Sequence, residues 1–126
     1  MSGNANGCGC TKELKLVFSC SGAADTGEVC DRSARQLNRA QEAKMYCLTG
    51  VGGRVPDIME NTKAASTILA MDGCPKDCAR KALLEAGIEN FKHLRVTDLG
   101  LKKGSSPATD ETIALVVGKA SEMLQA

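Results

Sequence analysis

Apolar residues along the chain alternate between short continuous runs and stripes in which they recur every three or four positions. Four runs are typical of strands buried in a sheet: residues 14–20, 44–48, 66–72 and 93–99. Helical stripes follow the runs, and we expect helices to begin near Glu28, at Pro56 and at Pro75. A last helix carries the apolar stripe between Ile113 and Leu124. The chain therefore alternates strand and helix four times.

This alternation predicts βαβ units with right-handed crossovers. We expect an α/β fold, a three-layer, open, Rossmann-like sheet of about four parallel strands in the order 2-1-3-4, with helices on both faces. With 126 residues the chain has the length of one domain, which we assign to residues 13–126. Residues 1–12 have no periodic pattern, and we expect them to form a flexible, cysteine-containing tail.

Composition argues against several classes of function. Charged residues make up 25% of the chain, the formal net charge is +1 and only 2% of residues are aromatic, so there is neither a basic stripe nor a stacking platform for nucleic acid. No stretch approaches the roughly 20 apolar residues of a membrane span, and the first residues lack the apolar region of a signal peptide. We therefore expect a cytoplasmic protein without a membrane or nucleic-acid partner.

The seven cysteines are the main chemical signal in the sequence. Their odd number and the lack of an export signal favour metal binding or thiol reactivity over a disulfide scaffold. Cys20, Cys47 and Cys74 follow the first three expected strands, whose carboxyl ends meet at one edge of a parallel sheet. Cys78 follows Cys74 by four residues, on the same face of the expected helix. These positions predict four thiols in one crevice.

Four thiols in one crevice match the needs of a metal site. Tetrahedral zinc takes thiolate ligands at about 2.3 Å, and thiols at a helix N-terminus ionise readily. Lys76, Arg80 or Lys81 could offset the net negative charge of such a site. We prefer zinc to an iron–sulfur cluster, because the cysteine spacing matches neither common ferredoxin pattern. We expect a role in metal handling or sensing, and the sequence identifies no protein partner.

The sequence also resembles a known family, the DGC-domain proteins, to which zinc binding is attributed. The resemblance covers most of residues 17–103 and is carried by four blocks: "FSCSGAADTGEVCDRSARQL", "YCLTGVGGRV", "AMDGCPKDCARKALLEAGI" and "RVTDLGLKK". It implies a small prokaryotic α/β protein with four characteristic cysteines, which fall here on Cys20, Cys47, Cys74 and Cys78. Asp72 and Gly73 complete the signature triplet with Cys74. The family implies no defined biochemical role.

Three further cysteines lie outside that pattern. Cys30 shares a helical stripe with Ala34 and Leu37, and we expect it to pack in the core as a small apolar residue. Cys8 and Cys10 form a C-x-C pair in the tail. This pair could supply an auxiliary metal ligand or a redox couple.

Other polar residues near the crevice have plainer explanations. Asp72 and Asp98 end the third and fourth expected strands, where Asp usually forms a turn or a cap. The segment "GVGGR" is expected to form a tight turn, because no Lys-Ser or Lys-Thr pair follows it as in a phosphate-binding loop. His93 stands at the start of the fourth expected strand, the wrong end of the sheet for the crevice. We therefore do not expect His93 to be a ligand.

A cysteine-based enzyme or redox protein is the main alternative. The segment from Cys74 to Arg80 fits C-x5-R, the spacing by which a cysteine nucleophile and an arginine cradle an oxyanion in low-molecular-weight phosphatases and arsenate reductases. Those loops follow the first strand, however, and Lys81 stands where a hydroxyl residue would assist. A thiol–disulfide switch, with Cys74 as nucleophile and Cys78 as the resolving thiol, is a second alternative. Metal binding remains the favoured hypothesis, and enzymatic activity is left open.

Overall fold

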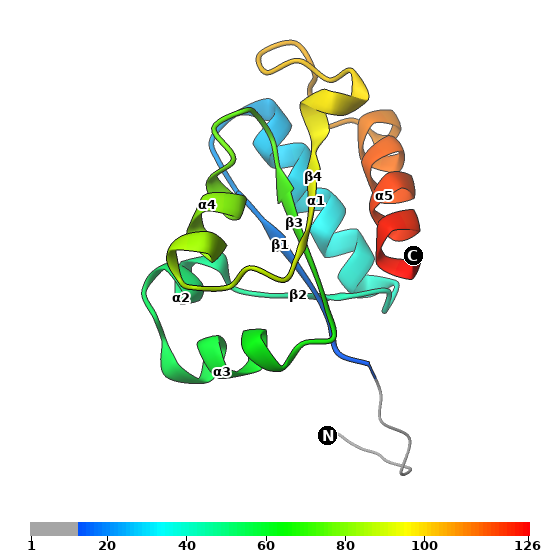
Figure 1. Ribbon diagram of the computed structural model, residues 1–126. Coiled ribbons are helices and arrows are strands. Elements are labelled where there is room, and N and C mark those ends of the chain that lie inside the picture. The colour runs from blue at the N-terminus through cyan, green and yellow to red at the C-terminus, as the bar shows by residue number, and fades with distance from the viewer. Residues whose placement is uncertain (1–12) are drawn as a thin grey trace.

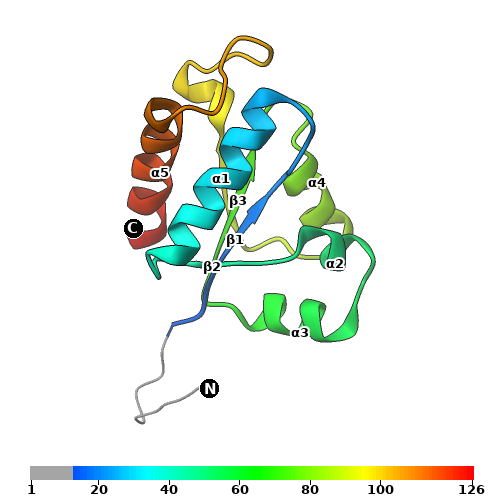
Figure 2. The same ribbon diagram turned by 180° about the vertical axis from the view of Figure 1, so that it is seen from behind.

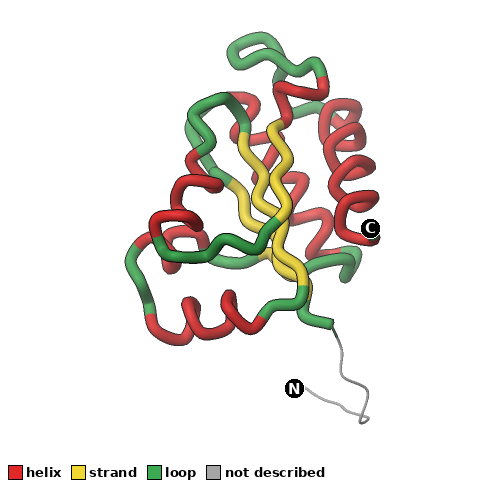
Figure 3. The backbone as a smooth tube through the Cα atoms, in the orientation of Figure 1, coloured by secondary structure: helices red, strands yellow, loops and turns green. Residues whose placement is uncertain are grey.

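The computed structural model describes residues 13–126 as a parallel sheet covered by helices on both faces (Figures 1 and 3). The strands are β1 (Lys15–Ser19), β2 (Lys44–Met45), β3 (Thr67–Asp72) and β4 (Lys92–Arg95). The helices are α1 (Asp25–Arg39), α2 (Leu48–Gly52), α3 (Pro56–Ala64), α4 (Cys78–Glu85) and α5 (Asp110–Gln125), with a 3-10 turn, η1 (Val96–Leu99), after β4. The strand order is β2-β1-β3-β4, which confirms the predicted topology.

The helices form two layers, one on each face of the sheet. Figures 1 and 2 show α1 and α5 on one face and α2, α3 and α4 on the other. Alternate residues of the two central strands feed the two cores: Val17, Leu69 and Met71 pack under α1 and α5, whereas Leu16, Phe18, Ile68 and Ala70 pack under α4. Both central strands are buried on both faces, as expected for a parallel sheet.

The second crossover differs from the prediction. The strand ends at Met45 instead of residue 48, and the segment expected to be a loop with a tight turn contains the short helix α2. Cys47 is the N-cap of that helix, and its Sγ accepts a hydrogen bond from the Gly50 N–H at 3.2 Å. A side-chain acceptor at the N-cap satisfies a backbone donor that would otherwise lack a partner, and this favours the helix.

The start of α4 also differs from the prediction. Pro75 does not open the helix, because the Asp77 N–H donates to the Cys74 carbonyl at 3.1 Å and closes a turn around Pro75. Asp77 then takes a left-handed conformation with φ of 53°, and the helix begins only at Cys78. Cys74 therefore lies outside the helix, so the expectation that Cys74 and Cys78 share one helix face is wrong.

The first helix and the fourth strand differ by a few residues. Helix α1 begins at Asp25, one turn earlier than expected, and its first turn carries Asp25 and Glu28, which suit the positive end of a helix dipole. The fourth strand ends at Arg95, and Asp98 lies in the 3-10 turn that follows, where its side chain is largely exposed. Asp98 therefore does not end a strand.

Among the helices of residues 13–126, each is too short or too polar to cross a membrane.

Candidate functional site at the carboxyl edge of the sheet

Asp72, the last residue of β3, organises the carboxyl edge of the sheet. Its side chain is only 1% exposed, and its two oxygens accept the N–H groups of Ala79 and Arg80 at 2.7 and 3.1 Å. These N–H groups belong to the first turn of α4, which has no cap from its own N-cap residue. Asp72 thus caps α4 from the neighbouring strand, which confirms the expectation of a capping role.

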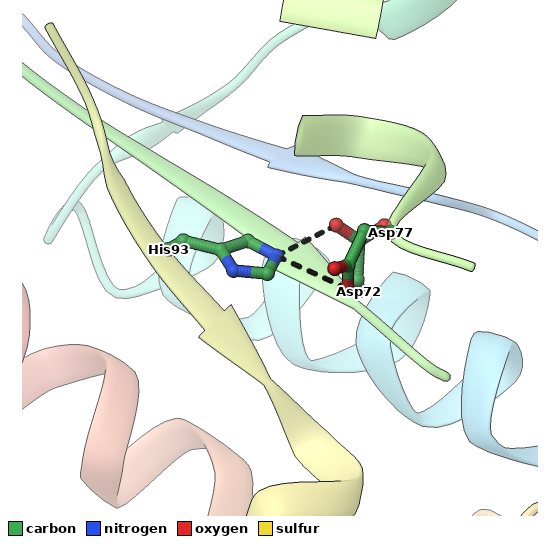
Figure 4. A group of neighbouring side chains, drawn as sticks. All are labelled: Asp72, Asp77 and His93. Carbon is green, nitrogen blue, oxygen red and sulfur yellow. Dashed lines mark hydrogen bonds and ion pairs between the residues drawn. The ribbon is translucent and has the colours of Figure 1, made fainter. Parts of the chain in front are cut away.

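His93 joins this carboxylate, contrary to the expectation that it lies at the wrong end of the sheet. It pairs with Ala70, which projects to the same face as Asp72 two residues further on. Because β4 has only four residues, a long side chain from its second residue reaches the carboxyl edge. The His93 Nε2 lies 2.8 Å from Oδ2 of Asp72 (Figure 4).

Asp77 supplies a second buried carboxylate at the same place. The guanidinium of Arg95 donates to both of its oxygens, with Nε 2.8 Å from Oδ1, and His93 Nε2 lies 3.7 Å from Oδ1. Hydrogen bonding to Arg95 lowers the pKa of Asp77 below its usual value, against the opposing effect of burial. The pair fixes Asp77, the left-handed residue that immediately precedes α4.

Asp72, Asp77 and His93 form a group that could hold a metal ion, since their ligand atoms lie within 4.8 Å of one another. Within residues 13–126 this is the only such group of three or more Cys, His, Asp or Glu side chains. Its oxygens, however, already accept the first N–H groups of α4 and the Arg95 guanidinium. As it stands, the group is a hydrogen-bonded network that anchors both ends of the segment 73–77.

Gly73 follows Asp72 at a point where two backbones touch. A Cβ built there would lie 2.8 Å from the Gly27 nitrogen and 2.8 Å from the Thr26 carbonyl carbon, at the start of α1. The Gly73 N–H donates to the Cys20 Sγ at 3.4 Å. The Asp-Gly pair of the signature thus combines a helix cap with a close approach that only glycine permits.

Gly73→Ala is expected to lower the free energy of unfolding by about 2 to 3 kcal/mol, because the atoms in the way are backbone and cannot move aside cheaply. Urea denaturation measures the change. Gly118→Ala in α5 is the matched control: its Cβ would meet nothing within 4 Å, and alanine in a helix is worth about 1 kcal/mol over glycine. Equal stabilities of the two variants would contradict the close approach.

Cys20 lies just beyond β1 and packs against both cores. A hydrogen bond from the Cys30 thiol, helped by the N–H groups of Gly22 and Gly73, lowers the pKa of Cys20 to about 6, although burial opposes the shift. The same contact and the burial of Cys30 raise the pKa of that second thiol. Cys30 does pack in the core, as expected, but it also contacts Cys20.

Cys74 meets a lysine that the sequence did not single out. The Lys103 Nζ lies 4.0 Å from the Cys74 Sγ. Lys103 sits in the loop between η1 and α5, which Asp25 holds by accepting the N–H groups of Gly104 and Ser106 at 2.8 and 2.9 Å. Hydrogen bonding to these N–H groups lowers the pKa of Asp25. The cation beside Cys74 comes from 29 residues further along the chain, where no local pattern marks it.

The other two predicted ligands are exposed. Cys47 lines a pocket of about 370 Å³ together with Arg35 and Arg39 of α1, and Cys78 is the first residue of α4. Within residues 13–126, no three of the four predicted ligand sulfurs, those of Cys20, Cys47, Cys74 and Cys78, lie within 4.8 Å of one another. The tail pair, Cys8 and Cys10, lies outside the described residues.

The chain is similar to proteins of a known family. Residues 16–120 match the family model described as the DGC domain. Over 90 residues, the chain is 38% identical to the anaerobic and virulence modulator AnvM of Pseudomonas aeruginosa, covering 71% of this chain and 69% of that protein. No solved structure matches the chain.

Proposed function

We propose that this protein, which belongs to the DGC domain family, binds zinc through cysteine thiolates at the carboxyl edge of its sheet and serves in metal handling or sensing. The proposed ligands are Cys20, Cys47, Cys74 and Cys78. The observation that carries the proposal is their origin: each follows a strand or begins a helix at the one edge where an open parallel sheet binds its ligands. A reducing compartment such as the cytoplasm would keep these thiols available.

The donor set fits zinc on chemical grounds. Zinc prefers thiolates, and Cys20 already has a thiolate-stabilising environment made by backbone N–H groups and the Cys30 thiol. Lys103 beside Cys74 offsets part of the negative charge that several thiolates bring together. The network of Asp72 and Asp77 anchors the segment that carries Cys74 and leads to Cys78. A bound zinc ion would supply a charge centre that ties these segments together.

The Asp72, Asp77 and His93 group is the competing place for a metal ion. We favour the thiolates because Arg95 already neutralises Asp77, and a divalent cation there would have to displace this guanidinium. The two sets make different predictions for substitution. Loss of His93 removes a ligand from one set and leaves the thiolates in place.

The alternative enzyme, with Cys74 as nucleophile in a C-x5-R loop, is less well supported. The N–H groups of Ala79 and Arg80, which such a loop would offer to an oxyanion, donate to the buried carboxylate of Asp72. A negative charge already occupies the position that favours an anion. The name of the P. aeruginosa relative, a modulator, also suits sensing better than catalysis.

Protein purified under reducing conditions is expected to contain about one zinc ion per chain, or up to two if Cys8 and Cys10 add a site. Elemental analysis measures this for the wild type, Cys74→Ser and His93→Gln. We expect His93→Gln to keep its zinc and Cys74→Ser to lose most of it. The reverse pattern would move the ion to the carboxylate–histidine group. Iron with visible absorption would point to a cluster, and a folded wild type that takes up no added zinc would refute the proposal.

A further inference from the structure

Three arginines lie along the exposed face of α1. Arg32, Arg35 and Arg39 follow one another at helical spacing, so their side chains share one side of the helix, and all three are exposed. Two pockets flank them, one of about 370 Å³ towards β2 and one of about 330 Å³ towards α5, and Arg35 and Arg39 line both. Figure 2 shows α1 on the outside of the fold, with α5 beside it and β2 near its carboxyl end.

The three guanidinium groups differ in what already neutralises them. Arg32 pairs with Glu28 at 2.8 Å, and the Nε of Arg35 donates to Asp31 at 2.9 Å. With residues 13–126, the terminal nitrogens of Arg35 and the whole guanidinium of Arg39 make no hydrogen bond or ion pair. Two side chains one helical turn apart therefore have donors to offer to an anion.

The pocket towards β2 also has an apolar wall. Met45 and Tyr46, both half-buried, line it together with Asn38. The Tyr46 ring meets Phe18 edge-on, with ring centroids 6.1 Å apart, and the Tyr46 hydroxyl accepts a hydrogen bond from Asn61 at 2.8 Å, so the ring is held in place. The Oδ1 of Asn38 accepts the Met45 N–H at 2.8 Å, which turns the amide nitrogen of Asn38 into a further donor for a ligand.

Charge distinguishes this pocket from its neighbour. Among residues 13–126, no carboxylate lines the pocket towards β2, whereas Asp110 lines the one towards α5. A further cation is close, because the Lys44 Nζ lies 5.7 Å from the centroid of the Tyr46 ring. Positive charge, an amide donor and apolar surface thus meet on the β2 side of α1, in a volume that suits a small organic anion.

We propose that the pocket lined by Arg35, Arg39, Met45 and Tyr46 binds a small phosphate monoester that carries an aromatic or apolar group. Such a phosphate has about two negative charges at neutral pH, which two guanidinium groups one turn apart can balance. Its oxygens accept several N–H groups at once from the planar forks of the arginines. The organic group packs against Met45 and Tyr46, and this contact distinguishes the ligand from inorganic phosphate.

An occupied pocket would also touch a proposed zinc ligand, because Cys47 lines the same pocket. This consequence alone rests on the proposed function. The arginines and the apolar wall need no metal ion to bind an anion, so a failure of zinc binding would leave the phosphate site in place.

An NMR titration tests the site in the full chain. Isotope-labelled protein, with its metal content left as purified, is titrated with phenyl phosphate at low ionic strength. We expect saturable shifts in the millimolar range at the backbone amides of Met45, Tyr46 and Cys47 and at the Nε–H signals of Arg35 and Arg39. Inorganic phosphate should bind at the same place several-fold more weakly, and phenol should give no saturable shift.

Arginine variants show whether the binding is specific. Arg39→Gln should weaken phenyl phosphate binding about tenfold, the loss expected for one charge-assisted donor group. Arg39→Lys keeps the charge without the fork and should fall between Arg39→Gln and the wild type. Arg32→Gln is the matched control, because Arg32 lies on the same face of α1 but does not line this pocket. Its binding should stay close to that of the wild type.

Equal losses in Arg39→Gln and Arg32→Gln would indicate a general attraction to basic surface and would overturn the proposal. So would shifts centred on the loop that carries Lys102 and Lys103, shifts that never saturate, or phenol that binds as tightly as phenyl phosphate. Because the substituted arginines are exposed, the spectrum of each variant should otherwise match that of the wild type.

Discussion

Replacing Asp72 with alanine is expected to lower the free energy of unfolding by about 3 to 5 kcal/mol, a larger loss than that expected for Gly73→Ala. The substitution leaves the N–H groups of Ala79 and Arg80 without their acceptor and removes the partner of His93. The Ala79 N–H would then be buried without a hydrogen bond, and the part-buried Arg80 N–H and His93 ring would have to turn to water. Urea denaturation of purified protein, with the metal state held fixed, measures the change.

Asp98→Ala is the matched control for this change. Asp98 is also an aspartate at the carboxyl edge, but its side chain is 66% exposed and its nearest cation, Arg95, is 3.7 Å away. Exposed pairs of this kind contribute little, so the variant should stay within about 0.5 kcal/mol of the wild type. Asp72→Asn should fall between the two, since an amide oxygen can still accept one N–H group. If Asp72→Ala is as stable as Asp98→Ala, the capping network does not hold the edge together.

The topology could be predicted because it depends on patterns that are local and strong. Continuous apolar runs at β1 and β3 mark strands buried on both faces, and the helical stripes between them require crossovers. The weak second strand was predicted too long, since the apolar residues after Met45 serve α2 instead. Periodicity gives element type more reliably than it gives element ends.

The details of the site could not be predicted, because they come from contacts between distant segments. The helix-start rule placed Pro75 at the first turn of α4, but the cap of that helix is Asp72, on the preceding strand. His93 was discounted because the expected strand was too long, and a four-residue β4 puts its second residue within reach of the edge. Spacing along the chain carries no information about either contact.

Charges and thiols that meet across the fold were missed for the same reason. Lys103 reaches Cys74 from a loop held by Asp25, and no motif marks either residue. Cys30 looked like ordinary packing, since its helical stripe explains its burial completely. Only the position of α1 over β1 brings its thiol to Cys20.

Removing the metal ion is expected to have the second large effect, because binding free energy of a structural zinc ion is also folding free energy. A strong chelator should therefore lower the thermal midpoint of the wild type clearly. Ser variants at Cys20, Cys47, Cys74 and Cys78 should each begin with a lower midpoint. Each should respond little to the chelator, since every one has lost a thiolate from the same ion.

The measurement that tests the central claim most directly is this chelator-sensitive difference in thermal midpoint, compared among the four Ser variants and Cys30→Ser. Cys30→Ser is the control, because Cys30 is not a proposed zinc ligand and a serine hydroxyl there can still donate a hydrogen bond to the Cys20 sulfur. The account predicts that the difference is largely lost in all four ligand variants and kept in Cys30→Ser. A Cys20 or Cys47 variant that keeps the full difference, with its zinc still bound, would contradict a shared four-thiolate site.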